Sequence, residues 1–350
     1  MCFLLNNPLS LRNLNLNYMK KIFIPFTFIL LFTIFAYTSS CNSSSDEVQE
    51  YPPKKINRLD EILYQTSQSG NFQALTNDGV ISKGTEAICY MLNMGHPDDS
   101  ALVKYVYSDA VKIFTPEVAK KFTNIESIEK VLGRVTINLE KEFPNIKIGN
   151  LFSFVSPYRQ SIYICDSTIL IALNHYLGTS HEAYNGFEEY IKKRKEDKFI
   201  PYDIVEALIS SNYPYEPSGN DDLLSKMLYA GAIIEAKMRT VPNATLEDAL
   251  GYSKEELKWV EENQQLIWNT LIAKELIYST SYMDIDRLLS PAPNTSIINS
   301  NSPGQVGRYI GYKIVTAYLA KNSATTLCNL FSPNIYKSQQ TLIKSEYNGK

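Results

Sequence analysis

Three glycines at helical spacing near the carboxyl end of the chain constrain its packing more than any other feature. Gly304, Gly307 and Gly311 lead on to Ile314 and Tyr318 in steps of three or four residues, which places all five on one face of a helix. Each interior glycine costs a helix about 1 kcal/mol relative to alanine, so such a stripe is typical of a helix that lies close against another backbone. The stripe indicates either tight packing within the chain or a docking face for a partner, formed by Gly304, Gly307, Gly311 and Tyr318.

Capping signals and hydrophobic periodicity predict a mainly helical body. The stretch Asn301–Asn322 would form the glycine-faced helix, with Ser302 as N-cap and Pro303 at the first helical position. Thr123 with Glu126, and Ser253 with Glu256, have the spacing of capping boxes. Further helices are predicted over residues 98–122, 123–143, 187–195, 201–211, 223–239, 253–277 and 333–345.

Two segments with a different period predict a small sheet. Residues 145–156 and 161–170 are rich in β-branched and aromatic side chains and are separated by a turn at residues 157–160. A loop rich in Pro, Asn and Ser is expected over residues 290–303. No internal repeat and no linker divides the body, so the expected fold class is α+β, mainly helical, with one globular domain over residues 58–350.

The amino terminus has the layout of a secretory signal. Lys20 and Lys21 precede Ile22–Tyr37, an uncharged run that is short for a membrane span, and small residues follow it. Residues 1–40 are therefore interpreted as a signal peptide, and Met19, directly before the two lysines, as the true start.

The small residues that end in Cys41 resemble a bacterial lipobox. Cleavage before Cys41 would make it a lipidated amino terminus that carries acyl chains such as palmitate, and two or three such chains anchor a protein stably. Residues 41–57 would form a polar tether, whose Ser-Asp-Glu run resembles a surface-export signal of Bacteroidota lipoproteins. The alternative is a plain secreted protein with an incidental cysteine.

The charge distribution argues against nucleic-acid binding. Residues 1–40 hold three of the 34 basic residues and none of the 37 acidic ones, so the remainder carries a net charge of −6. Neutralising phosphates requires clustered Lys and Arg, whereas the longest basic run here, residues 192–195, is followed at once by two acids. We expect no nucleic-acid partner.

Histidine is scarce, which limits metal chemistry. His181-Glu182 begins like the HExxH zinc motif, in which two histidines one turn apart bind the metal and the glutamate activates water. The second histidine position is Asn185, a poor zinc ligand. His175, in an apolar context, is favoured as a hydrogen-bonded core residue. A divergent zinc metallopeptidase using His175, His181 and Glu182 remains an alternative, but no catalytic residue, metal ligand or cofactor is predicted.

The 24 tyrosines offer another alternative. Exposed tyrosines can stack on sugars or peptides, although core and surface packing is their commoner use. A surface glycan- or peptide-binding lipoprotein would use the tyrosines at residues 213–215 or 278–282.

A series of segments in order along the mature chain resembles the gliding-motility lipoprotein GldB family of Bacteroidota. The segments are residues 169–178, 188–208, 223–238, 251–280, 302–322 and 332–347. The resemblance implies a lipid-anchored cell-envelope protein, in the outer membrane, that binds or scaffolds a protein partner beside gliding or type IX secretion machinery.

This family is also similar, distantly, to gluzincin-type zinc peptidase domains, which implies a zincin-like layout. In such relatives an HExxH helix would lie near residues 200–211 and a glutamate ligand in the next helix. Here the first segment has no histidine, and Ala230 stands where the glutamate would be. The resemblance therefore implies a peptidase-like scaffold without its metal ligands, in which Glu206 is a surface or packing residue.

Overall fold

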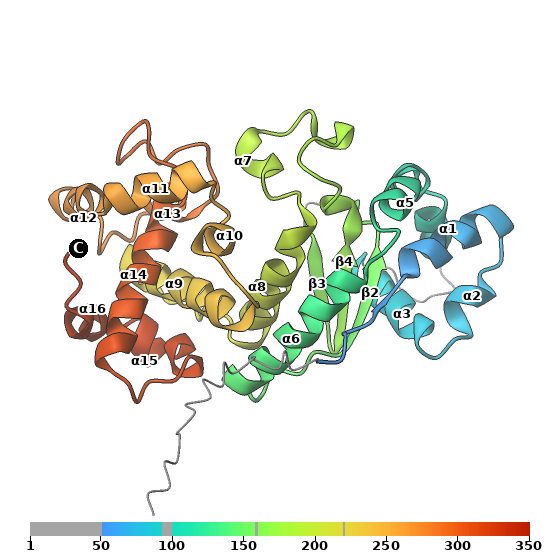
Figure 1. The fold of residues 1–350 in the computed structure, drawn as a ribbon, viewed down its shortest axis with the longest axis horizontal. Helices are drawn as coiled ribbons and strands as arrows, with labels where there is room; N and C mark the ends of the chain where they lie inside the picture. Colours follow the sequence, from blue (N-terminus) through green and yellow to red (C-terminus); the bar gives the residue numbers. More distant parts are fainter. Residues whose placement is uncertain (1–50, 93–99, 158–159, 220) are drawn as a thin grey trace, which may run out of the picture. The chain divides into compact units, whose positions relative to one another are not determined.

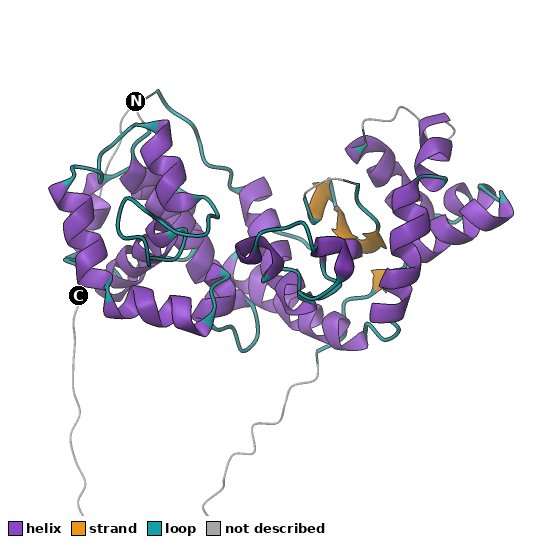
Figure 2. Cartoon of the chain, turned by 90° about the horizontal axis from the view of Figure 1, so that it is seen from above, coloured by secondary structure: helices purple, strands orange, loops and turns teal. Residues whose placement is uncertain are grey.

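A computed structural model describes residues 51–92, 100–157, 160–219 and 221–350 (Figure 1). The predicted signal peptide, the start at Met19, the lipidated Cys41 and most of the tether lie outside the described residues. Helices dominate the described part and the strands form one small sheet (Figure 2), so the predicted α+β, mainly helical class is confirmed.

Within the described residues the sheet has the strand order β1-β2-β4-β3. The strands are β1 (Ile56–Asn57), β2 (Asn150–Phe154), β3 (Ile162–Cys165) and β4 (Thr168–Ala172). The β1-β2 and β2-β4 pairs are parallel, and β3 pairs with β4 in the antiparallel direction. The second predicted strand, residues 161–170, is divided into β3 and β4 by a tight hairpin at Asp166, which has a left-handed backbone (φ 52°). The turn predicted at residues 157–160 lies between β2 and β3, and residues 158–159 are outside the described residues.

The two faces of the sheet are covered by different helices. Leu151 and its neighbour Ile169 belong to a large apolar cluster that includes helices α6 and α8. Phe152 and its neighbour Leu170 point the other way, into a smaller cluster with Leu59 of α1. Because successive side chains of a strand alternate between faces, a strand buried on both faces is expected to be mainly apolar, as residues 169–172 of β4 are.

The helices in chain order are α1 (Leu59–Ser69), α2 (Gln73–Thr76), α3 (Ile81–Met91), α4 (Ser100–Val106), α5 (Asp109–Lys121), α6 (Glu126–Glu142), α7 (Glu189–Lys192), α8 (Ile200–Asn212), α9 (Leu223–Thr240), α10 (Leu246–Leu250), α11 (Lys254–Glu262), α12 (Gln264–Ala273), α13 (Tyr282–Leu289), α14 (Val306–Lys321), α15 (Pro333–Tyr336) and α16 (Gln339–Ser345). The predicted helices at 201–211 and 223–239 are confirmed, and so is the capping box of Ser253 and Glu256.

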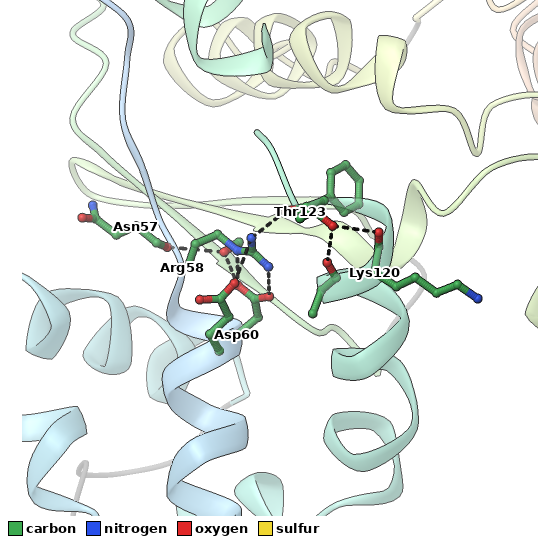
Figure 3. Close-up of polar contacts among 9 residues, drawn as sticks. Asn57, Arg58, Asp60, Lys120 and Thr123 are labelled. Atoms are coloured by element: carbon green, nitrogen blue, oxygen red, sulfur yellow. Dashed lines mark hydrogen bonds and ion pairs between the residues drawn. The ribbon is translucent and has the colours of Figure 1, made fainter. Parts of the chain in front are cut away.

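Several helix boundaries differ from the predictions. The helix predicted over 98–122 is two helices, because Ser108 accepts a hydrogen bond from the Val111 amide and starts α5. The helix predicted over 253–277 divides at Asn263, and only Glu189–Lys192 of 187–195 is α-helical. Thr123 does not form a capping box, because its hydroxyl donates to the carbonyl groups of Ala119 and Lys120 in the helix before it (Figure 3).

Helix α14 begins later than its capping signals predict. Ser302 exchanges hydrogen bonds with the backbone of Thr295 and closes the loop that precedes the helix. The residue before the first turn is Gln305, in a left-handed conformation with φ 61°. Gly304 therefore lies in the loop rather than on the helical stripe, although it too packs closely, against the Ala292 backbone.

The glycine stripe faces the chain's own backbone. A Cβ atom added to Gly311 would lie 1.9 Å from the carbonyl oxygen of Met227 in α9, and one added to Gly307 would lie 2.9 Å from the carbonyl oxygen of Leu288 in α13. Gly304, Gly307, Gly311 and Tyr318 are all buried. The tight-packing alternative describes this geometry, and in this conformation the four residues are closed to a partner.

The folded body begins before residue 58, the boundary that we predicted. Ile56 is buried in β1, and the backbone oxygen of Pro52 lies 2.2 Å from where a Cβ atom of Gly133 would be. Residues 52–57 thus pack on α6 and β2 rather than extending the tether.

A buried carboxylate connects the first helix to the sheet (Figure 3). Asp60 is fully buried and accepts two hydrogen bonds from Arg58, at 3.0 and 2.8 Å, and a third from the Ser153 hydroxyl. Arg58 also donates to the carbonyl oxygen of Phe122, at the end of α5. The start of α1, strand β2 and the end of α5 are therefore held together by one polar cluster.

Replacing Asp60 with asparagine is expected to lower the free energy of unfolding by about 2 kcal/mol, because the charge-assisted hydrogen bonds from Arg58 are lost in a buried position. Urea unfolding followed by circular dichroism would measure this loss. Glu61→Gln is the matched control, since Glu61 bonds the same Arg58 from an exposed position and should change stability by less than about 0.5 kcal/mol. Equal effects of the two substitutions would contradict the prediction.

Candidate functional site

Helix α8 lies between the sheet and α9 (Figure 1). One side of this helix lines a cavity with Asp203, Glu206, Ala207 and Ser210. The cavity has a volume of about 420 Å³, within the range of small-ligand pockets. Its other walls come from residues 160–162, 175–176 and 190–195, from Pro291 and from residues 305–308 at the start of α14. Charged side chains from α8, from residues 190–195 and from α14 meet in it.

Glu206, on α8, is the central acid of this cavity. Its carboxylate accepts a hydrogen bond from Lys237 of α9 and another, at 2.9 Å, from Nη2 of Arg308 on α14. Burial alone would raise the pKa of Glu206, but Arg308 and Lys237 outweigh it and hold that pKa well below its ordinary value. A carboxylate so stabilised is a weak base at neutral pH.

Lys237 is the buried partner of this acid. Its side chain is fully buried, and among the residues that the structure describes it bonds Glu206 and the carbonyl oxygen of Ala249, the latter at 3.4 Å. Burial lowers the pKa of Lys237 to about 8, although Glu206 opposes the shift. An ammonium group that is out of contact with water depends on its counterion, so Lys237 and Glu206 form a structural unit.

A second acid on α8, Asp203, is also paired. It accepts hydrogen bonds from Arg194 Nη2 at 2.5 Å and from the Tyr176 hydroxyl at 2.8 Å. Arg194 stacks over the Phe199 ring and fills the space beside Gly251, where a Cβ atom would lie 2.3 Å from its Nη1. Arg194 therefore packs against the chain as much as it faces the cavity.

Two cations of the cavity keep donors that the described residues do not use. Arg308 bonds Glu206 and Gln305, but among the described residues its buried Nε has no hydrogen-bond partner. Lys195 contacts Nδ1 of His175 at 3.2 Å and forms no ion pair within the described part of the chain. Burial lowers the pKa of Lys195, a shift that Asp203 opposes and Arg194 adds to.

An apolar cavity adjoins the charged one. It has a volume of about 760 Å³ and shares His175, Tyr190, Ile191 and Lys195 with the first cavity as a common wall. Its other walls are mainly apolar or aromatic and include Ile113, Phe114, Ala183, Tyr184 and Phe187. The ammonium group of Lys195 lies over the rings of Tyr184 and Phe187, at 5.5 and 5.8 Å from their centres.

The histidines weighed as metal ligands have other roles in the structure. His175 is nearly buried beside Lys195, while Nε2 of His181 lies 3.4 Å from Glu117 on α5. Glu182 begins a short 3₁₀-helix rather than the α-helix that the zinc motif needs. Among residues 51–92, 100–157, 160–219 and 221–350, no group of three His, Cys, Asp or Glu side chains is placed to hold a metal.

The helices proposed to correspond to a zinc peptidase also do not fit the metal. Helix α8 carries Glu206 and no histidine, and two cations, Lys237 and Arg308, already contact that carboxylate. Positive charges at this position oppose the binding of a divalent cation. The residues present therefore do not fit zinc.

The tyrosines of the glycan-binding alternative divide into two groups. Tyr215 packs against the rings of Tyr229 of α9 and Tyr336 of α15, and Tyr213 contacts the rings of Phe143 and Phe331. Tyr278 and Tyr282 are 50% and 81% exposed and are free to meet a ligand. Only the second group keeps the surface exposure that this alternative requires.

Sequence reasoning missed the charged cavity. It treated Glu206 as a surface or packing residue and gave no role to Lys237, Arg194 or Arg308. One signal was present, since Lys237 and Arg308 each interrupt the apolar face of a helix that is otherwise suited to burial. A cation at such a position indicates a buried partner, but only the fold shows that both cations converge on one carboxylate.

Comparison with known protein families finds one family that matches this chain. The sequence profile described as "Gliding motility protein GldB" matches residues 41–349. The chain belongs to this family. Membership makes it a lipoprotein related to gliding motility and supports a lipid-anchored place in the cell envelope. The match covers the whole described body, including α8, α9 and α14, which form the charged cavity.

The remaining comparisons add no relative. No curated protein and no solved structure matches the chain, so the gluzincin-like resemblance that we stated is not shown. None of the helices in the described ranges is long and apolar enough to cross a membrane.

Proposed function

We propose that this chain is anchored in the outer membrane by lipid on Cys41 and acts there by binding a protein of the gliding or secretion machinery, without catalysis. The family supports the envelope setting, and its match begins at Cys41, the residue that the lipobox-like sequence marks. Acyl chains on that cysteine would hold the body at the membrane surface.

The observation that carries the non-catalytic part is the state of Glu206. In a peptidase-like layout this helix would supply the general base, whose pKa should lie near the working pH. Here Lys237 and Arg308 hold the pKa of Glu206 far below that range and occupy both carboxylate oxygens. The same groups that disable a base create a cavity with an excess of positive charge, which is suited to binding.

Replacing Cys41 with serine is expected to release the protein from membranes. In Triton X-114 partitioning, the chain without the substitution should enter the detergent phase and the Cys41→Ser variant should enter the aqueous phase. Mass spectrometry of the chain that keeps Cys41 should show a diacylglyceryl group on an amino-terminal Cys41. Cys328→Ser is the matched control, because Cys328 is a free thiol of the folded body. A Cys41→Ser protein that stays in the detergent phase would show that Cys41 is not the anchor.

The binding role is tested in the same strains. Cross-linking in whole cells should join the unmodified chain to a specific envelope protein, and the Cys41→Ser chain, displaced from the membrane, should lose that product together with cell gliding or secretion. If cells with the released variant glide and secrete normally and keep the same cross-links, an anchored binding role in these processes is wrong.

A further inference from the structure

The charged cavity and its apolar neighbour share one wall, and the charge around the first cavity is not balanced. Arg194, Lys195 and Arg308 line the charged cavity against two carboxylates, Asp203 and Glu206. Lys237, on the far side of Glu206, adds a further cation to the same group. Four cations and two acids leave an excess of two positive charges in a partly buried region, where an unneutralised charge is costly.

The unused donors identify where a negative group would be bound. Asp203 and Glu206 both form ion pairs with other cations, and within the described part of the chain neither forms a direct ion pair with Lys195. Lys195 stands in the shared wall with donors beyond the one that reaches His175. Arg308 lines the same cavity, and its side chain is 14% exposed. An anion placed between these two cations would neutralise the excess charge.

The neighbouring cavity specifies the rest of the ligand. Beyond Lys195 the wall becomes mainly apolar, with Tyr184, Phe187, Ile113 and Phe114 around a space of about 760 Å³. Its polar members outside the shared wall are Asp109, Ser156 and Asn174, so the acid there would repel a carboxylate and favours placing that group on the Lys195 side. Ile113 and Phe187 are 62% and 45% exposed, although both are large apolar side chains that gain by being covered. A ligand that occupies both cavities therefore carries a negative group next to an aromatic or aliphatic one.

We propose that the paired cavities form a binding site for a carboxylate attached to an apolar group, with the carboxylate between Lys195 and Arg308 and the apolar group against Tyr184 and Phe187. The carboxyl-terminal residue of a peptide with an aromatic or aliphatic side chain has this chemistry, and so has a fatty acid. This inference deepens the proposed binding function by naming the class of group that is bound.

The test is calorimetric titration of the full chain in detergent with three probes. The first is a short peptide that ends in phenylalanine with a free carboxylate, the second is the same peptide with a terminal amide, and the third is dodecanoate. The free acid should bind at least about tenfold more tightly than the amide, because a charge-assisted hydrogen bond is worth about 1.5–3 kcal/mol. Binding of dodecanoate instead of the peptide would support the site and identify the source of the carboxylate as a lipid.

Two variants locate the ligand. Lys195→Gln breaks no ion pair of the described structure, so it should fold normally and weaken carboxylate binding by about tenfold. Phe187→Ala should weaken the binding of the peptide that ends in phenylalanine. It should leave unchanged the ratio of the affinities for the free-acid and amide peptides. Lys198→Gln, which removes an exposed lysine paired with Asp248, is the control and should bind as the unmodified chain does.

The proposal is overturned if no carboxylate probe binds, if the amide binds as tightly as the acid, or if Lys195→Gln and Lys198→Gln behave alike. These failures are distinct from failure of the proposed function. An anchored chain that still forms its specific cross-link in cells, but binds no carboxylate, would keep the envelope role and lose only this site.

Discussion

Replacing Gly311 with alanine is expected to lower the free energy of unfolding by about 3 kcal/mol, although the same substitution favours an isolated helix by about 1 kcal/mol. The added Cβ atom would lie 1.9 Å from the carbonyl oxygen of Met227 and 2.6 Å from its carbonyl carbon. Both are backbone atoms of a buried helix, so neither can move aside as the end of a flexible side chain could. Helices α9 and α14 would have to separate along their length.

The measurement is urea unfolding of the full chain, with Gly186→Ala as the control. Nothing lies within 4 Å of the Cβ position at Gly186, so that substitution should leave stability nearly unchanged. Gly231, which meets Gly311 from the other helix, should respond as Gly311 does, because its Cβ atom would lie 2.2 Å from the Gly311 carbonyl carbon. A Gly311→Ala protein as stable as the unmodified chain would show that the two helices are not packed this closely.

The glycine stripe shows which part of the helix packing can be predicted from the sequence and which part cannot. The spacing of Gly307 and Gly311 requires a close backbone neighbour, and this much could be predicted. The identity of that neighbour could not, because nothing local in residues 302–322 distinguishes a helix of the same chain from a helix of a partner. The structure identifies it as α9 for Gly311 and as α13 for Gly307, both helices of the same chain.

Local sequence patterns predicted the structure correctly where all the interacting groups lie within one short segment. Ser253 and Glu256 form the predicted capping box because both bonds are made within one turn. Thr123 and Glu126 have the same spacing, but the Thr123 hydroxyl finds acceptors in the preceding helix instead. The Thr123 hydroxyl can bond either the amide groups of the helix that follows it or the carbonyl groups of the helix before it. The spacing of Thr123 and Glu126 does not predict which of these partners it bonds.

The candidate site failed to appear for a related reason. Arg194, Glu206, Lys237 and Arg308 are separated by at least 12 residues in sequence, and each is unremarkable in its own segment. Only the packing of α8 on α9, with the start of α14 beside them, brings their charges together. The strand pairing could not be predicted for the same reason, since β2 pairs with β4 although β3 lies between them in the sequence.

Replacing Glu206 with glutamine is expected to cost about 4 kcal/mol at pH 7, because it leaves the fully buried ammonium of Lys237 without a counterion. The loss should be smaller at pH 9. The pKa of Lys237 is already lowered to about 8 by burial, so above that value the lysine sheds its proton and no longer needs the carboxylate. Denaturant unfolding at the two pH values measures both quantities, and Glu262→Gln, at an exposed ion pair, is the control with an expected change below about 0.5 kcal/mol.

Glu206, the acidic member of this pair, makes the stability of the folded chain depend on pH in the opposite direction. Because Arg308 and Lys237 hold the pKa of Glu206 well below its ordinary value of 4.5 in the folded chain, the unfolded chain binds the proton first as the pH falls. The contribution of Glu206 is thus complete above pH 4.5 and is lost progressively below it. Glu206→Gln should remove this part of the acid dependence.

A double substitution separates a structural role of this pair from a role in binding. Glu206→Gln with Lys237→Met removes both buried charges and should recover most of the stability lost in the single variant, since an apolar side chain of similar size replaces the ammonium. If the double variant is no more stable than Glu206→Gln alone, the cost does not come from Lys237. If it is stable and still binds the free-acid peptide, then Lys195 and Arg308 suffice for the carboxylate, and the buried pair serves only to hold α8 against α9.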